Sequence, residues 1–233
     1  MGATASMLGW PDALYAVEDM ADDVLAILDS YGIEQATLMG MSLGGYIAQM
    51  LALEHPARVR SLILVSSEPL GWNGPALPHI SETILEHFGN LSALDWTDRD
   101  AVIAFLLGID KLSAGSGQPF DEAGARARIE QVLDRANSPA SMFNHATLSV
   151  REDWTGRFRD ISCPVLVIHG EEDPVLPVEN GRAIAAGIKD AELFVMPKVG
   201  HELPASQLPA IAERAAEHTH RFAKIGVRAP GEN

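Results

Sequence analysis

The sequence is poor in several features, and each shortage argues against a class of protein. Its 233 residues include one cysteine, Cys163, so no disulfide can form within the chain. This suits a reducing compartment, and we expect a cytoplasmic protein. No apolar run approaches the roughly 18 residues that a membrane-spanning helix needs, so no membrane partner is expected. Basic residues are scarce: 17 Lys and Arg stand against 32 Asp and Glu, and the net charge of −15 argues against nucleic acid as a partner.

Apolar runs alternate with amphipathic segments along most of the chain. The runs at residues 36–41, 61–65, 164–170 and 191–196 predict four buried strands. The spacing of Val17, Met20, Ala21, Val24, Leu25 and Leu28 predicts a helix, and further helices are expected at residues 43–55, 178–188 and 205–222. This alternation predicts an α/β fold with a mostly parallel sheet and helices on both faces.

The middle of the chain has a different pattern. Between residues 68 and 160 we find helical stretches at 80–88, 101–107, 120–136 and 138–148, and no run that predicts a buried strand. The expected organisation is therefore a core of residues 1–67 and 161–233, interrupted by a helical lid insertion at 68–160. Apolar residues of the insertion could line a substrate pocket or pack within the lid. They are Trp72, Phe88, Trp96, Phe105, Leu106, Leu107, Phe120, Met142 and Phe143.

Residues 40–44 read Gly-Met-Ser-Leu-Gly and join the first predicted strand to its helix. This is the G-x-S-x-G pattern in a strand–turn–helix context, where glycines permit a sharp turn and a serine is exposed above the sheet. The pattern predicts Ser42 as a nucleophile. It also places the N–H of Leu43 at a helix N-terminus, where it can stabilise a developing oxyanion.

A serine nucleophile needs a base and an acid that orients the base. Among eight histidines, His201 lies in the loop after the last predicted strand, at the edge of the sheet that carries Ser42. Asp173 follows the third strand and is the expected acid; the neighbouring Glu171 and Glu172 are expected to be solvated charges, and Glu68 is the second choice. The histidines show no metal-ligand spacing.

With these residues in place, the sequence resembles the α/β-hydrolase superfamily over nearly its whole length. Residues 18–24, 40–45 and 55–62 are similar to those of lid-bearing serine esterases, and 164–174 and 200–204 resemble the acid and histidine loops. Residues 117–121 (Gly-Gln-Pro-Phe-Asp) and 145–148 (His-Ala-Thr-Leu) suggest the aclacinomycin methylesterase type. The order Ser, Asp, His along the chain also fits.

The resemblance implies cofactor-free hydrolysis of a small-molecule carboxylic ester through an acyl-enzyme. Alternatives are another Ser-triad chemistry (perhydrolase, thioesterase or C–C hydrolase) or a catalytically weak fragment that acts as a binding or dimerising module. The family carries early strands before the helix at Val17, with a loop that gives the second oxyanion donor. We find no His-Gly motif before Ser42 and expect an N-terminally truncated fold. Residues 36–41 would then form an open edge through which the chain could form a homo-oligomer.

Overall fold

The computed structural model describes residues 15–223. Within them lies a four-stranded, fully parallel sheet in the order β1-β2-β3-β4. The strands are β1 (Ala36–Met41), β2 (Val59–Val65), β3 (Val165–Gly170) and β4 (Glu192–Met196). The predicted α/β class and the positions of all four strands are confirmed.

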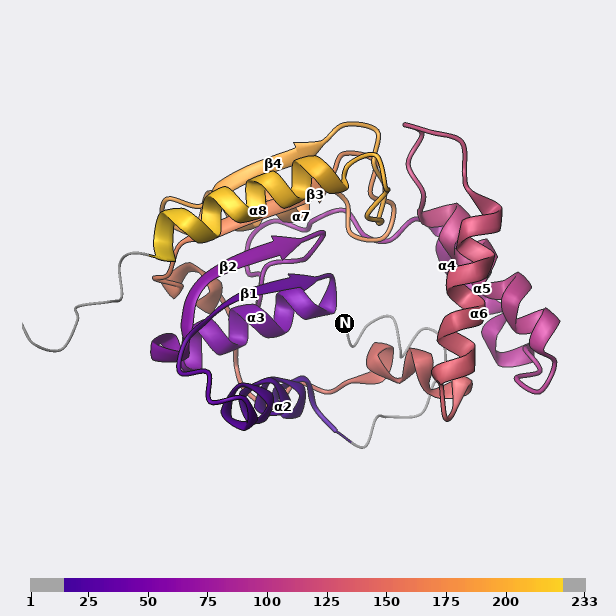
Figure 1. Cartoon of the computed structure of the whole chain (residues 1–233), viewed down its shortest axis with the longest axis horizontal. Coiled ribbons are helices and arrows are strands. Elements are labelled where there is room, and N and C mark those ends of the chain that lie inside the picture. The colour runs from indigo at the N-terminus through magenta and orange to yellow at the C-terminus, as the bar shows by residue number, and fades with distance from the viewer. Residues whose placement is uncertain (1–14, 224–233) are drawn as a thin grey trace, which may run out of the picture.

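Helices cover both faces of the sheet (Figure 1). The alternation of side chains along the strands decides which face each residue joins. The helices of the sheet region are α2 (Val17–Ser30), α3 (Leu43–Glu54), α7 (Glu179–Gly187) and α8 (Leu208–Ala223). On β2, Leu62 and Leu64 belong to a core shared with α3 and α7, whereas Ile63 and Val65 face α8.

The strand β1 is less buried than a central strand. Among the described residues it pairs only with β2, and most of its side chains are partly exposed. Met39 is 50% exposed, whereas its register partner on β2, Ile63, is buried. Within residues 15–223, the run at residues 36–41 is therefore an edge strand rather than the fully buried strand that its composition suggests.

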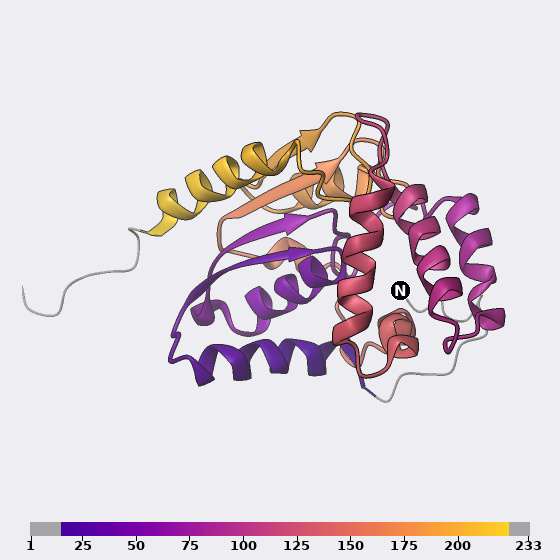
Figure 2. The same ribbon diagram turned by 45° about the vertical axis from the view of Figure 1, so that its right-hand side comes forward.

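The insertion between β2 and β3 contributes helices and no strand of the sheet. Its helices are α4 (Glu82–Gly89), α5 (Arg99–Ser113) and α6 (Glu122–Arg135). The last predicted helix, 138–148, is instead a 3-10 stretch (Pro139–Thr147). Figures 1 and 2 both show α4, α5 and α6 beyond the ends of the strands that carry the arrowheads.

Apolar side chains between residues 88 and 143 form a separate core within the insertion, whereas Leu70, Leu148, Trp154 and Phe158 belong to the main core. All those singled out in the sequence pack in the separate core, except Trp72, which packs against Phe158 in the main core. Two of them, Trp96 and Phe143, also line a cavity of about 320 Å³ within the insertion.

Candidate active site

Ser42 lies at the sharp turn between β1 and α3. Its backbone has φ 52° and ψ −119°, a conformation that costs a non-glycine residue about 1–3 kcal/mol. The turn is held by its N–H, which donates to Val65 O at 2.9 Å, and by its carbonyl, which accepts from Gly45 N at 3.0 Å. The Ser67 hydroxyl donates to the same carbonyl at 2.9 Å. The Ser42 hydroxyl caps no N–H of α3. No capping hydrogen bond therefore competes with a reaction at this hydroxyl.

Close packing explains two of the glycines at this turn. A Cβ on Gly40 would lie 2.2 Å from Gly44 O, and one on Gly45 would lie 2.7 Å from the Ser67 side chain. A Cβ on Gly44 would meet nothing within 4 Å. Close packing therefore requires glycine at position 40, the first glycine of the motif, and at position 45, directly after the motif.

Leu43 is the first residue of α3. The first N–H groups of a helix have no partner within the helix and form the positive end of its dipole. Leu43 N–H is therefore placed where an anion beside Ser42 would be stabilised.

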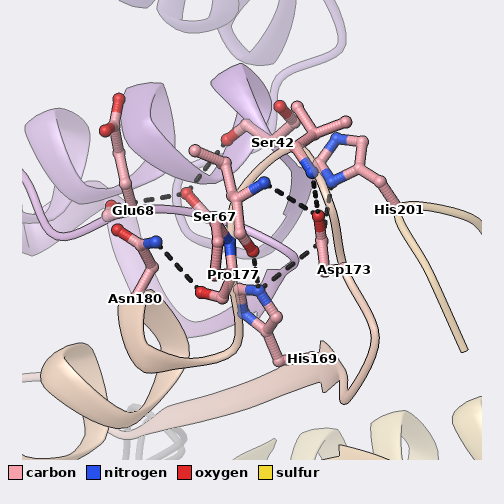
Figure 3. Close-up of polar contacts among 10 residues, drawn as sticks. Ser42, Ser67, Glu68, His169, Asp173, Pro177, Asn180 and His201 are labelled. Atoms are coloured by element: carbon pink, nitrogen blue, oxygen red, sulfur yellow. Dashed lines mark hydrogen bonds and ion pairs between the residues drawn. The ribbon is translucent and has the colours of Figure 1, made fainter. Parts of the chain in front are cut away.

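The carboxylate of Asp173 lies in the loop after β3, with a side chain that is completely buried. Its Oδ1 accepts the backbone N–H groups of Val175 at 2.9 Å and Leu176 at 2.8 Å. Its Oδ2 lies 2.7 Å from Nδ1 of His201 (Figure 3). Buried carboxylates are stable when their oxygens are satisfied in this way.

His201 follows β4, and its ring is 14% exposed. Because an ionised carboxylate only accepts hydrogen bonds, the contact with Asp173 places the ring proton on Nδ1 and leaves a lone pair on Nε2. A ring in this tautomer can accept a proton. Figure 3 shows Ser42, Asp173 and His201 in one part of the structure. Between the described residues Ser42 and His201 there is no hydrogen bond, so contact of the serine with the base stays a prediction.

The other carboxylates considered from the sequence lie elsewhere. Glu68 follows β2, and burial raises the pKa of its carboxyl above the ordinary value; His201 contacts Asp173, not Glu68. Glu171 is exposed, as expected. Glu172 is also exposed but is not simply solvated, because it accepts two hydrogen bonds from Ser116.

A second histidine, His169, contacts the acid loop and was missed in the sequence. Its side chain at the end of β3 is fully buried, and its Nε2 lies 2.7 Å from Leu176 O and 3.6 Å from Asp173 Oδ2. A carbonyl oxygen only accepts, so Nε2 carries the proton, and the buried Nδ1 has no partner. Burial lowers the pKa of His169, which keeps the ring neutral. The available signal was a polar residue at the end of an apolar run, four residues before Asp173.

A parallel sheet with a serine at a strand–helix turn and an Asp–His pair beyond later strands defines the class of α/β hydrolases. The chain belongs to the alpha/beta hydrolase fold family, whose model matches residues 2–205. Fold class and family, both predicted from the sequence, are thus confirmed.

The curated relatives are hydrolases of different kinds. The chain is 28% identical to a putative carbamate hydrolase RutD of Variovorax paradoxus, over 94% of this chain and 78% of that protein. It is 27% identical to the rhodomycin D methylesterase DnrP of Streptomyces peucetius, over 88% and 74%. A 2-hydroxy-6-oxononadienedioate/2-hydroxy-6-oxononatrienedioate hydrolase of Paraburkholderia phymatum is 28% identical, over 75% of this chain and 59% of that protein. The chain thus spans 59–78% of these three relatives.

Solved structures of enzymes are also similar to this chain. A hydrolase from Pseudomonas aeruginosa is 25% identical with a TM-score of 0.60, covering 92% of this chain and 74% of that one. Est816, described as an N-acyl homoserine lactone degrading enzyme, is 26% identical with a TM-score of 0.59, covering 92% and 76%. Among residues 15–223, no helix is long and apolar enough to cross a membrane.

Proposed function

We propose that this chain is a serine hydrolase that cleaves a carboxylic ester through an acyl-enzyme. Ser42 is the nucleophile, His201 the general base, Asp173 the orienting acid and the Leu43 N–H one oxyanion donor. The observation that carries the proposal is the 2.7 Å contact between buried Asp173 and His201, at the sheet edge where the strained turn presents Ser42.

The reaction follows from the protonation states of these groups. Ser42 Oγ attacks the ester carbonyl while its proton moves to Nε2 of His201, and the oxyanion that forms is stabilised by the Leu43 N–H. Collapse of this intermediate expels the alcohol, which takes the proton from His201. Water then attacks the acyl-serine, again losing a proton to His201, and release of the acid returns that proton to Ser42. Asp173 stays ionised and stabilises the imidazolium of His201 throughout.

The insertion supplies the expected pocket cover. We place residues 68–160 over the mouth of the site as a lid, because α4, α5 and α6 lie beyond the carboxyl ends of the strands. The same region would decide which ester enters. The chain is placed in the cytoplasm because its only cysteine excludes an internal disulfide.

A labelling experiment tests the chemistry without knowledge of the substrate. A fluorophosphonate probe reacts with an activated serine, so the wild-type chain should be labelled on Ser42, and Ser42→Ala should lose the label. Absence of labelling in a folded wild-type chain would favour a binding module without catalysis. Labelling that persists in Ser42→Ala would assign the nucleophile to another residue.

Another hydrolase chemistry has support from the different names of the relatives. One relative is described as a carbamate hydrolase and another as a methylesterase, at nearly equal identity. A panel of methyl esters, thioesters and carbamates distinguishes these activities. The highest kcat/KM on a methyl ester would support the proposed ester hydrolysis. A clear preference for a thioester or a carbamate would show that the chain catalyses that reaction instead.

A further inference from the structure

The loop between α5 and α6 contacts both loops that carry the candidate acid and base. The carbonyl of Ser113, the last residue of α5, accepts the backbone N–H of His201 at 2.8 Å. Four residues on, Gly117 N–H donates to Lys198 O at 2.9 Å. The Gly115 N–H donates to the Glu202 carboxylate at 2.9 Å. This segment of the insertion, residues 113–117, therefore packs against the segment on either side of His201.

The contact is a close approach of two backbones. A Cβ on Gly200 would lie 2.0 Å from Ser113 O, and one on Gly115 would lie 2.2 Å from Lys198 O. Side chains at these positions would separate the two segments. The position of His201 is thus tied to the end of α5 by main-chain hydrogen bonds.

The loop that carries Asp173 contacts residues 113–117 through one carboxylate, that of Glu172. Oε2 of Glu172 accepts the backbone N–H of Ser116 at 2.7 Å, and Oε1 accepts the Ser116 hydroxyl at 2.8 Å. These hydrogen bonds lower the pKa of Glu172, so the carboxylate is ionised at neutral pH. Glu172 directly precedes Asp173, and its own N–H donates to Val199 O at 2.9 Å, which joins the acid loop to the histidine loop.

We propose that Glu172 and Ser116 are positioning residues that hold the Asp173–His201 pair in place, so that residues 113–117 of the insertion support the active site as well as cover it. The proposal rests on the proposed function for its effect on catalysis. It accounts for part of the sequence around residues 117–121: Gly117 contacts Lys198, Phe120 packs in the core of the insertion, and Asp121 caps α6 by accepting Gly124 N–H at 3.0 Å.

Exposed side chains make the test possible without disturbing a core. Glu172→Ala should lower kcat for ester hydrolysis about tenfold, a part of the roughly 100-fold that a 1 Å displacement of reacting groups can cost. Ser116→Ala should lower kcat less, because the backbone N–H of residue 116 still donates to Glu172. KM should stay within about twofold, because neither side chain is expected to bind substrate. The double variant should be no worse than Glu172→Ala, because Glu172→Ala alone removes both hydrogen bonds between the two residues. Glu172→Gln should recover most of kcat, because an amide can still bond to the Ser116 N–H and hydroxyl.

The neighbouring Glu171→Ala is the matched control and should keep wild-type kcat, since Glu171 is an exposed acid of the same loop. Wild-type kcat in Glu172→Ala, a change confined to KM, or equal loss in Glu171→Ala would each overturn the positioning role. So would a Gln variant no better than Ala.

A spectroscopic readout separates this proposal from the proposed function. In the full chain, the Nδ1 proton of His201 should give a downfield, slowly exchanging NMR signal, assigned by its loss in His201→Gln. In Glu172→Ala this signal should broaden through faster exchange with water, and in Glu171→Ala it should not change. If the wild-type chain neither hydrolyses esters nor reacts with fluorophosphonate, the proposed function is wrong while this measurement still decides the positioning role. An unchanged signal in Glu172→Ala overturns that role whatever the activity.

Discussion

His201 and Asp173 meet through Nδ1 and Oδ2 at 2.7 Å, and the second oxygen of Asp173 is occupied by the N–H groups of Val175 and Leu176. The two oxygens therefore have different partners. Oδ1 holds the loop through backbone N–H groups, whereas Oδ2 faces the ring that would take the proton from Ser42. A substitution can therefore change the contact with the ring and keep the hydrogen bonds of the loop.

The variant Asp173→Asn should fold and lose activity. Its amide oxygen can still accept the Val175 and Leu176 N–H groups, but its NH₂ group would face Nδ1 of His201 and favour the wrong tautomer. We expect kcat to fall by about 10⁴, by analogy with the Ser-His-Asp triad, with little change in the urea midpoint. Glu68→Gln is the comparison. If Asp173→Asn keeps wild-type activity and Glu68→Gln loses it, the acid role belongs to Glu68.

Two adjacent glycines offer a matched pair of stability variants. Gly45→Ala should lower the free energy of unfolding by about 1–3 kcal/mol, because the new methyl group would lie 2.7 Å from the Ser67 side chain. Gly44→Ala should leave it unchanged or raise it by up to about 1 kcal/mol, since the site is open and alanine favours the helix. Urea denaturation of both variants measures this. Equal destabilisation would show that the packing at Gly45 does not limit the turn.

The strand positions could be predicted because buried parallel strands are short apolar runs, and each of β1 to β4 overlaps such a run. The region at 138–148 was predicted less well: its apolar spacing indicates a helix, but periodicity cannot separate an α-helix from the 3-10 turns that follow Pro139.

Contacts between distant loops left no pattern in the sequence. Glu172 looked like a solvated charge because its partner, Ser116, lies 56 residues away in the insertion. The importance of His169 lies in its burial against Asp173, and the burial of one polar residue in an apolar strand becomes visible only in the folded structure. The site roles of Ser42, Leu43, Asp173 and His201 remain predictions that the experiments above test.

We expect this chain to self-associate through β1, which among residues 15–223 pairs with another strand on one side only. The backbone groups on its other side, beside the exposed Met39, can pair with the same strand of a second copy. Met39→Lys should raise the dissociation constant about tenfold, because it brings two like charges together in a symmetric pair. Val132→Lys is the control, since Val132 is 48% exposed but lies on α6. Sedimentation equilibrium should show the difference. A wild-type chain that stays monomeric at all concentrations, or an equal effect of Val132→Lys, would refute pairing through β1.

The buried His169 should make stability depend on pH in the range just below neutrality. Burial lowers its pKa in the folded chain, so below the ordinary value of about 6.5 the unfolded state binds more protons than the folded state. The contribution of this group to the free energy of unfolding is therefore fully present above pH 6.5 and falls as the pH is lowered, by up to about 1.4 kcal/mol per pH unit.

In urea denaturation at pH 7.5 and 5.5, His169→Gln should lose less stability between the two pH values than the wild type. Some dependence should remain, because the pKa of buried His218 is also lowered. His220→Gln, at an exposed position on α8, should behave as the wild type. If His169→Gln keeps the full wild-type dependence on pH, the prediction that His169 stays neutral in the folded chain is wrong.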